Sequence, residues 1–272
     1  ADSFTIPTFD LMRLLVVIML FLCSVPSFSQ ERVTTFGVQM KPIIPSNLFR
    51  AGATELSQNG VDYALNQQVG YAFGGVMRFG LNKWLSLESG ISFVRRNFSA
   101  QVYHEELSFA DTTDFRIIGY EIPISGLVFV RLSDKIYMNA SFGLALDMFP
   151  SDVSSGTSQD FYQYSLRTGF ANSNSILNFV KTGLIANIGF EYRTKESGYF
   201  YIGASYHRPF SPIYNTGINY TYTNSTAKFE DLGVLQLSGN YLTIDFKYFF
   251  HEEKREKKVE RDPSTMPSWM KK

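Results

Sequence analysis

The stretch that decides the fold reads Tyr241-Leu242-Thr243-Ile244-Asp245-Phe246-Lys247-Tyr248-Phe249-Phe250. From Leu242 to Phe250 every second residue is apolar or aromatic. The intervening positions begin with Thr243, Asp245 and Lys247. Because successive side chains of a strand point to opposite faces, this stretch predicts a strand with one apolar face and one ionic face.

The same period of two recurs along the chain. Further alternating segments start at Phe36, Phe73, Leu85, Ile118, Ile136, Val180 and Phe200. Short connections are expected at residues 82–83, 133–135 and 194–198, and long ones at residues 45–68, 97–114, 150–175 and 214–236, which are rich in Ser, Thr, Asn and Gly. Alternation of tight turns and long loops is typical of bacterial membrane barrels, with short turns in the periplasm, long loops outside, and both termini in the periplasm.

The polar faces of these segments carry both charge signs in nearly equal number. They predict a polar network in the barrel lumen, formed by Lys41, Arg78, Glu88, Glu121, Arg131, Asp147, Lys181, Glu191, Arg193, His207, Asp245 and Lys247. In a small membrane barrel such side chains fill the interior while the apolar faces meet lipid. The predicted fold is therefore all-β: an up-and-down antiparallel transmembrane β-barrel of about eight strands.

Aromatic residues gather near the short connections. We expect a belt at the membrane interface formed by Phe79, Trp84, Tyr137, Tyr192, Tyr199, Phe200, Tyr248 and Phe250. Tyr and Trp favour the boundary between hydrocarbon and headgroups, which supports a membrane barrel. A soluble lipocalin-like barrel is the alternative, with the apolar faces forming a core.

Composition narrows the function classes. Net charge is zero, so no overall electrostatic field points to a nucleic-acid partner. Charged residues make up 18% of the chain and aromatic residues 16%.

An export signal is expected at residues 12–29, and it contains the single cysteine, Cys23. The upstream segment, 1–11, is interpreted as a misassigned start. A barrel domain at residues 30–250 and a charged periplasmic tail at 251–272 follow. Lipidation at Cys23 is the alternative to cleavage after Ser29, but the preceding Leu22 is bulkier than lipidation signals require.

A family resemblance lies in three short motifs. Tyr120-Glu121-Ile122-Pro123-Ile124, the Gly-rich run from Gly70 to Val76, and Trp84-Leu85-Ser86-Leu87-Glu88 are similar to the outer-membrane β-barrel proteins of Bacteroidetes that include PorT-like members. The resemblance spans roughly residues 36–250. It implies an integral outer-membrane protein, and for PorT-like members an association with a secretion system.

Function is predicted from these features as structural, anchoring or protein-interacting, without an enzyme activity, a cofactor or a metal. A narrow pore for small solutes is the first alternative; an ion-pair plug is the competing interpretation of the same lumen charges. A lipid-modifying enzyme built on Ser205, His207 and Glu121 is the second. Expected partners are outer-membrane lipid, the barrel-assembly machinery through the last strand, and a periplasmic or outer-membrane protein through the tail and loops.

Overall fold

The computed structural model describes residues 34–45, 54–82, 84–106, 109–150, 152–159, 162–170, 179–194, 197–223 and 228–250. The strands are β1 Thr34–Ile44, β2 Thr54–Gln58, β3 Val61–Gly80, β4 Leu85–His104, β5 Phe109–Arg131, β6 Ile136–Met148, β7 Ser154–Gln159, β8 Tyr162–Phe170, β9 Val180–Arg193, β10 Tyr199–Pro209, β11 Tyr214–Thr223, β12 Lys228–Leu237 and β13 Tyr241–Phe249. The expected segments at 1–11 and 12–29 and the tail at 251–272 lie outside the described residues. No helix in the described part is long and apolar enough to cross a bilayer.

Eight strands close into a ring, which we call the ring throughout. Its order is β1-β13-β10-β9-β6-β5-β4-β3, and β3 returns to β1. All of these pairings are antiparallel, and Gly37 of β1 faces Phe249 of β13 on one side and Val76 of β3 on the other. Closure matters in hydrocarbon, where an unpaired backbone group costs several kcal/mol. The predicted eight-stranded antiparallel transmembrane barrel is confirmed.

The short turns of the ring lie where the alternation predicts them. In the turn before β4, Asn82 Oδ1 accepts hydrogen bonds from the backbone N–H groups of Trp84 and Leu85, at 2.8 and 2.7 Å. The backbone N–H of Phe250 donates to the carbonyl of Phe36 at 2.8 Å, so the last ring strand ends beside the start of the first. Thr34 in turn pairs with Phe79, next to that same turn. The first and last ring strands thus meet at the end that carries the short turns.

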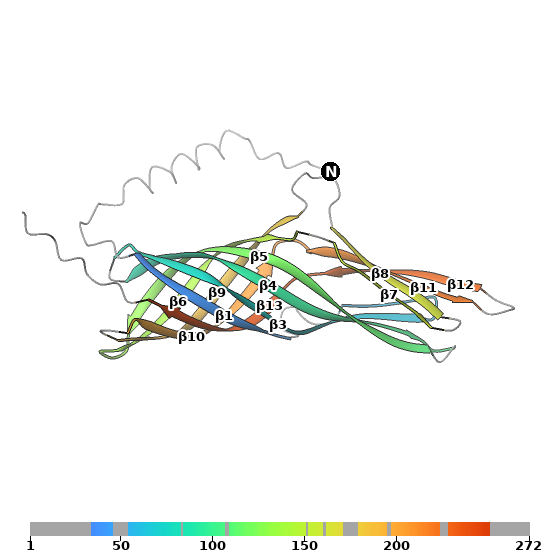
Figure 1. Cartoon of the computed structure of the whole chain (residues 1–272), viewed down its shortest axis with the longest axis horizontal. Helices are drawn as coiled ribbons and strands as arrows, with labels where there is room; N and C mark the ends of the chain where they lie inside the picture. The colour runs from blue at the N-terminus through green and yellow to red at the C-terminus, as the bar shows by residue number, and fades with distance from the viewer. Residues whose placement is uncertain are drawn as a thin grey trace, which may run out of the picture. The chain divides into compact units, whose positions relative to one another are not determined.

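The expectation of four long loops is wrong for the parts that the structure describes. Those segments form β2, β7, β8, β11 and β12, together with the distal ends of β3, β4 and β5. A strand of about 9–11 residues suffices to cross a membrane, whereas β3, β4 and β5 have 20, 20 and 23 residues. Figure 1 shows these three strands running from the ring to β7, β8, β11 and β12. We call this second region the extension.

The extension is made of two sheets joined by side chains. A four-stranded sheet has the order β12-β11-β8-β7, and β2 forms a hairpin with β3 through Asn59 and Gly60, both with positive φ. Such turns favour Asn-Gly because glycine adopts positive φ without strain. Strand β12 lies beside β2 without a backbone ladder. Asp231 joins them by accepting hydrogen bonds from Tyr63, Asn59 and Gln58, at 2.6, 2.7 and 2.9 Å.

The two regions differ in which side chains they bury. On the outer wall of the ring Phe142, Ile124 and Phe246 are 62%, 50% and 47% exposed, while Asp245 and Glu191 inside are fully buried. The interior of the extension is instead an apolar cluster that includes Val61, Tyr63, Leu65, Phe98, Val102, Phe115, Ile117, Phe149, Leu166, Ile213, Ile218, Tyr220 and Leu235. The ring therefore has the inverted polarity of a membrane barrel, and the extension has the polarity of a water-soluble domain.

Candidate functional site in the ring interior

The first polar layer of the ring lies nearest the short turns. Arg78 donates to Glu88 from Nη2 at 2.9 Å and from Nε at 3.2 Å, and its Nη1 donates to Glu191 at 2.5 Å. Lys247 Nζ donates to the other oxygen of Glu88 at 2.5 Å, and Arg193 Nε donates to Glu191 at 2.5 Å. These residues come from β3, β4, β9 and β13, so the layer ties together strands that are distant in sequence.

Aromatic rings cover this layer from inside the barrel. The Arg78 guanidinium carbon is 4.0 Å from the centroid of Phe249, and that of Arg193 is 4.1 Å from Tyr137 and 5.4 Å from Tyr199. Placing Tyr137 and Tyr199 at the lipid interface was therefore wrong, because cation–π contacts hold both rings on the inward side. The other predicted belt residues lie on the outer wall or its turns: Phe79, Trp84, Tyr192, Phe200, Tyr248 and Phe250.

A second layer surrounds the carboxylate of Asp245. Thr243 and Asn187 donate to it at 2.5 and 3.0 Å, and Ser205 Oγ also donates to it. Asn187 in addition donates to Ser205 Oγ at 2.8 Å and accepts from Tyr201 at 2.5 Å. The charge of Asp245 is thus balanced by hydrogen bonds, which is the condition for burying a carboxylate at tolerable cost.

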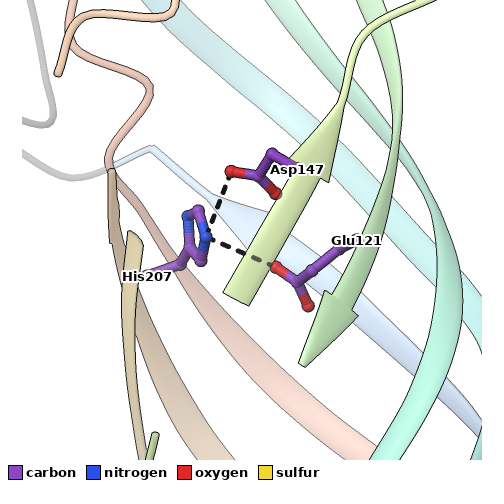
Figure 2. A group of neighbouring side chains, drawn as sticks. All are labelled: Glu121, Asp147 and His207. Carbon is purple, nitrogen blue, oxygen red and sulfur yellow. Dashed lines mark ion pairs between the residues drawn. The ribbon is translucent and has the colours of Figure 1, made fainter. Parts of the chain in front are cut away.

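The third layer, next to the extension, holds the group of side chains in Figure 2. His207 Nε2 lies 3.2 Å from Asp147 Oδ2 and 3.7 Å from Glu121 Oε2, and the imidazole points between the two carboxylates. All three side chains are at most 2% exposed. Lys41 Nζ lies 3.6 Å from Glu121, and Arg96 Nη2 lies 3.5 Å from Asp147. Each carboxylate therefore has a cation of its own beside the shared histidine.

Three potential metal ligands meet in this layer, since oxygens of Glu121 and Asp147 and a nitrogen of His207 all lie within 4.8 Å of one another. The surrounding charges decide against assigning a metal here. Lys41 and Arg96 already neutralise the two carboxylates. A divalent cation would add two uncompensated positive charges to a site from which water is excluded. The arrangement fits a structural group in which His207 lies between two ion pairs, Lys41–Glu121 and Arg96–Asp147.

Tyr241 completes the third layer. Its ring stacks on His207 with centroids 4.7 Å apart, its hydroxyl donates to Glu121, and the guanidinium carbon of Arg96 lies 4.7 Å from its centroid. Tyr241 thereby covers one face of the His207 imidazole, and the His207 side chain is fully buried.

The geometry gives no support for a serine nucleophile. Ser205 Oγ is engaged by Asp245 and Asn187. His207 occupies the next inward position after Ser205 on β10. Its Nε2 atom faces Glu121 and Asp147 and not Ser205. A serine nucleophile requires a hydrogen bond to its base, and this pair has none among the contacts of the described residues.

All twelve predicted lumen residues occupy strand positions of inward parity in the ring. Ten of them are buried: Lys41, Arg78, Glu88, Glu121, Asp147, Lys181, Glu191, His207, Asp245 and Lys247. Arg193, at the turn end, is partly exposed. Arg131 is a correction, because its side chain is 59% exposed and pairs with Asp134 in the adjoining turn. It keeps the inward parity of β5, but the strand ends there, so the guanidinium reaches water at the rim.

Sequence reasoning missed several residues of the same network. Arg96 is the largest of them, and continuing the alternation of β4 by even steps from Glu88 would have placed it inside. Tyr201 lies on the ionic face of its strand, where Gly189 and Gly203 leave room for its hydroxyl; a Cβ at either glycine would overlap it. The available signal was the presence of aromatic residues on the polar face of a strand, which was interpreted as a membrane-interface belt for Tyr137 and Tyr199.

Comparison with protein-family models and with curated proteins finds no match. Among solved structures, the outer membrane protein OprG from Pseudomonas aeruginosa is similar with a TM-score of 0.47 at 12% identity, over 80% of this chain and 96% of that one. The outer membrane protease OmpT from Escherichia coli gives 0.39 at 11% identity, over 84% and 99%, and the β domain of the Bordetella autotransporter BrkA gives 0.30 at 9%, over 80% and 98%. At these identities and TM-scores the likeness carries no conclusion about substrate, partner or activity.

Proposed function

We propose that this chain is a closed, non-catalytic outer-membrane barrel that acts by presenting its extension to a protein partner. The observation that carries the proposal is the pairing of a filled ring with a folded extension. The ring supplies an anchor in lipid, and the extension supplies a rigid surface beyond it. Structural, anchoring and interaction roles all follow from this division of the molecule.

The filled interior favours an anchor over a pore. Three layers of ion pairs and hydrogen bonds cross the ring, from Arg78 at the turn end to His207 near the extension. Beyond them the apolar cluster of the extension follows, including the fully buried Ile213 and Ile218. A small solute would have to displace both ion pairs and an apolar core. With eight strands, side chains are expected to fill the interior.

A partner-binding surface is favoured by the order of the extension. Its strands are paired in ladders and packed on a common core, so its outward side chains are presented in fixed positions. Two aliphatic residues, Leu232 and Val234, are 58% and 54% exposed on β12. Exposed aliphatic side chains on a water-facing sheet are common at protein interfaces.

Conductance separates this proposal from the pore. The full chain in planar bilayers is expected to give no steady openings, while a general porin in the same bilayers shows that openings are detectable. Steady openings of this chain would contradict the proposal. A photo-reactive amino acid at Val234 should then give protein adducts in intact cells, whereas the same group at Ile124 on the ring should give lipid adducts. Equal protein adducts from both positions would remove the extension as the interaction surface.

Two finer roles remain open to test within this proposal. A link to a secretion system is based on the resemblance to PorT-like proteins alone, and loss of secreted substrates on deletion of the gene would support it. The non-catalytic role predicts that His207→Gln leaves lipid profiles of the membrane unchanged. Altered acylation or phospholipid turnover in that variant would favour the lipid-modifying enzyme instead.

A further inference from the structure

Three arginines face outward where the apolar band of the ring ends, at the side of the extension. They are Arg95 on β4, Arg116 on β5 and Arg208 on β10. The next outward positions toward the ring are Phe93, Ile118 and Tyr206. Since Phe93, Ile118 and Tyr206 lie at the edge of the lipid-facing wall, the guanidinium groups lie at the level where lipid headgroups begin.

Two of these arginines share a hollow in the outer wall. The hollow has a volume of about 590 Å³, and its lining residues are Gln68, Arg95, Asn97, Phe98, Ser99, Gln101, Thr112, Asp114, Phe115 and Arg116. Arg95 pairs with Ile118 and Asn97 pairs with Arg116. Arg95 and Arg116 are therefore diagonal neighbours on one face of adjacent strands, about 7–8 Å apart in such a register.

A bulge in β3 shapes the edge of this hollow. Gln68 pairs with Asn97 and Tyr71 with Arg95, so two residues of β3 oppose one residue of β4. Asn97 Nδ2 donates at 2.7 Å to the carbonyl of Val69, within the bulge. Arg95 Nε donates at 3.1 Å to Asn97 Oδ1, which holds the guanidinium at the rim of the hollow. The bulge and Asn97 thus position one arginine without neutralising it.

Both arginines carry a charge that no ion pair within the described part of the chain neutralises. No ion pair joins Arg95 or Arg116 to a carboxylate among the described residues, although Asp114 contributes to the same lining. Arg95 also lies over the Tyr71 ring, at 5.8 Å from its centroid. Two guanidinium groups against one carboxylate leave the hollow with a positive balance and with unused donors.

We propose that this hollow binds a phosphate group on the headgroup of a lipid in the leaflet that faces the extension. Guanidinium groups match phosphate in charge and in the geometry of paired donors. The exposed amide of Gln101 and the exposed hydroxyl of Thr112, both in the lining, can bond the polar remainder of the headgroup. Acyl chains of the same lipid would run along the apolar wall past Phe93 and Ile118. The proposal requires the ring to lie in a bilayer, but it does not depend on the partner-binding role of the extension.

The test compares lipids that differ only in phosphate. The full chain in detergent micelles is titrated with bisphosphorylated lipid A, with the same lipid A after removal of its phosphates, and with inorganic phosphate, and binding is followed by native mass spectrometry. Tight binding of the phosphorylated lipid is expected. The double variant Arg95→Gln/Arg116→Gln should bind it at least about tenfold more weakly, since charge-assisted contacts are lost.

A matched control uses an arginine that faces outward on β8, away from the hollow. Arg167→Gln removes one positive charge there by the same substitution and should leave binding unchanged. Heat modifiability on electrophoresis checks that each variant is folded. Three results would overturn the proposal: equal binding of dephosphorylated lipid A, unchanged binding in the double variant, or binding of inorganic phosphate as tight as that of lipid A.

Discussion

The ring and the extension are built from the same long strands but place their polar side chains on opposite sides. In the ring Glu88 and Ser92 of β4 point inward, and Leu87 and Ile91 point outward. Further along the same strand, Val102 points inward. The solvent on the outside explains the difference, because hydrocarbon surrounds the ring and water surrounds the extension. Strand geometry itself is indifferent to which face is polar.

The change occurs without a break in β4. Arg96 is the last polar residue on its inward face before Phe98, and Arg95 follows Phe93 on the outward face. Arg96 lies at the boundary of the two interiors, since it pairs with Asp147 at 3.5 Å and lies 5.3 Å from the ring of Phe149. In β3 a bulge shifts the alternation of inward and outward residues by one position at this boundary. In β4 the alternation continues unbroken, and only the types of residue on each face change. The boundary is therefore encoded by residue order rather than by a hinge or a linker.

The largest effect is expected from placing an apolar side chain inside the ring. Arg78→Met removes a cation that pairs with both Glu88 and Glu191 in the buried interior, so it should lower the free energy of unfolding by about 3–5 kcal/mol. Adding Glu191→Gln should recover part of this loss. By contrast Ile218→Met in the extension should cost less than about 1.5 kcal/mol. Urea titration of the reconstituted protein measures all three, and equal costs for Arg78→Met and Ile218→Met would erase the difference between the two interiors.

A smaller effect is expected on the outer walls. Ile124→Arg introduces a charge on the lipid-facing wall of the ring and should cost about 2–4 kcal/mol. Val234→Arg makes the same chemical change on the outer face of the extension, and should cost no more than about 0.5 kcal/mol. Refolding into lipid vesicles from urea distinguishes them. If Val234→Arg were as damaging as Ile124→Arg, the outside of the extension would not face water.

The sequence predicted the ring correctly, because the alternation of apolar and polar residues was sufficient to assign the two faces of its strands. The alternation in Tyr241–Phe249 predicted a lipid-facing wall and an ionic interior, and the ring confirms that arrangement. The rule failed beyond the ring, because the inward face of β11 and β12 carries apolar side chains such as Ile218, Leu235 and Leu237, whereas the inward face of the ring strands is polar. Rich in Asn, Thr and Tyr, it was interpreted as a loop. A change of surrounding solvent along the chain is not visible in local periodicity.

Individual side chains were predicted less well than faces. Tyr137 and Tyr199 were placed with the lipid-facing aromatics, but Arg193 holds both on the inward side. Arg131 was assigned to the lumen by parity although its strand ends there. The pairing of Lys41 with Glu121 and of Arg96 with Asp147 depends on which strands become neighbours across the ring. Parity gives the face of a residue, and only closure of the ring gives its partner.

The smallest effect is expected at the seam between β2 and β12, and it depends on pH. Burial raises the pKa of Asp231, but hydrogen bonds from Tyr63, Gln58 and Asn59 outweigh it and hold that pKa below its ordinary value. A carboxyl group with a lowered pKa stabilises the folded state above its ordinary pKa of about 3.9, and this contribution is lost as pH falls through the lowered value. The seam should stay closed from pH 7 to about pH 4 and loosen below it.

Distances between spin labels at Glu55 and Leu232 measure this opening. Asp231→Leu should widen the label distance already at pH 7, with a cost of about 1–3 kcal/mol to the extension and none to the ring. A label distance at pH 7 that is the same in Asp231→Leu as in the unchanged chain would mean that Asp231 does not hold the seam.

Labels placed one at a time along β4 test the inversion of polarity most directly. In a chain with Cys23→Ser, the remaining sequence has no cysteine, so single cysteines can be introduced at outward positions and given an environment-sensitive fluorophore. Brominated lipid should quench labels at Leu87 and Ile91, whereas a water-soluble quencher should reach labels at Gln101 and Tyr103, with the change falling near Arg95. Quenching by brominated lipid at all four positions, or by the aqueous agent at all four, would contradict two solvents along one strand.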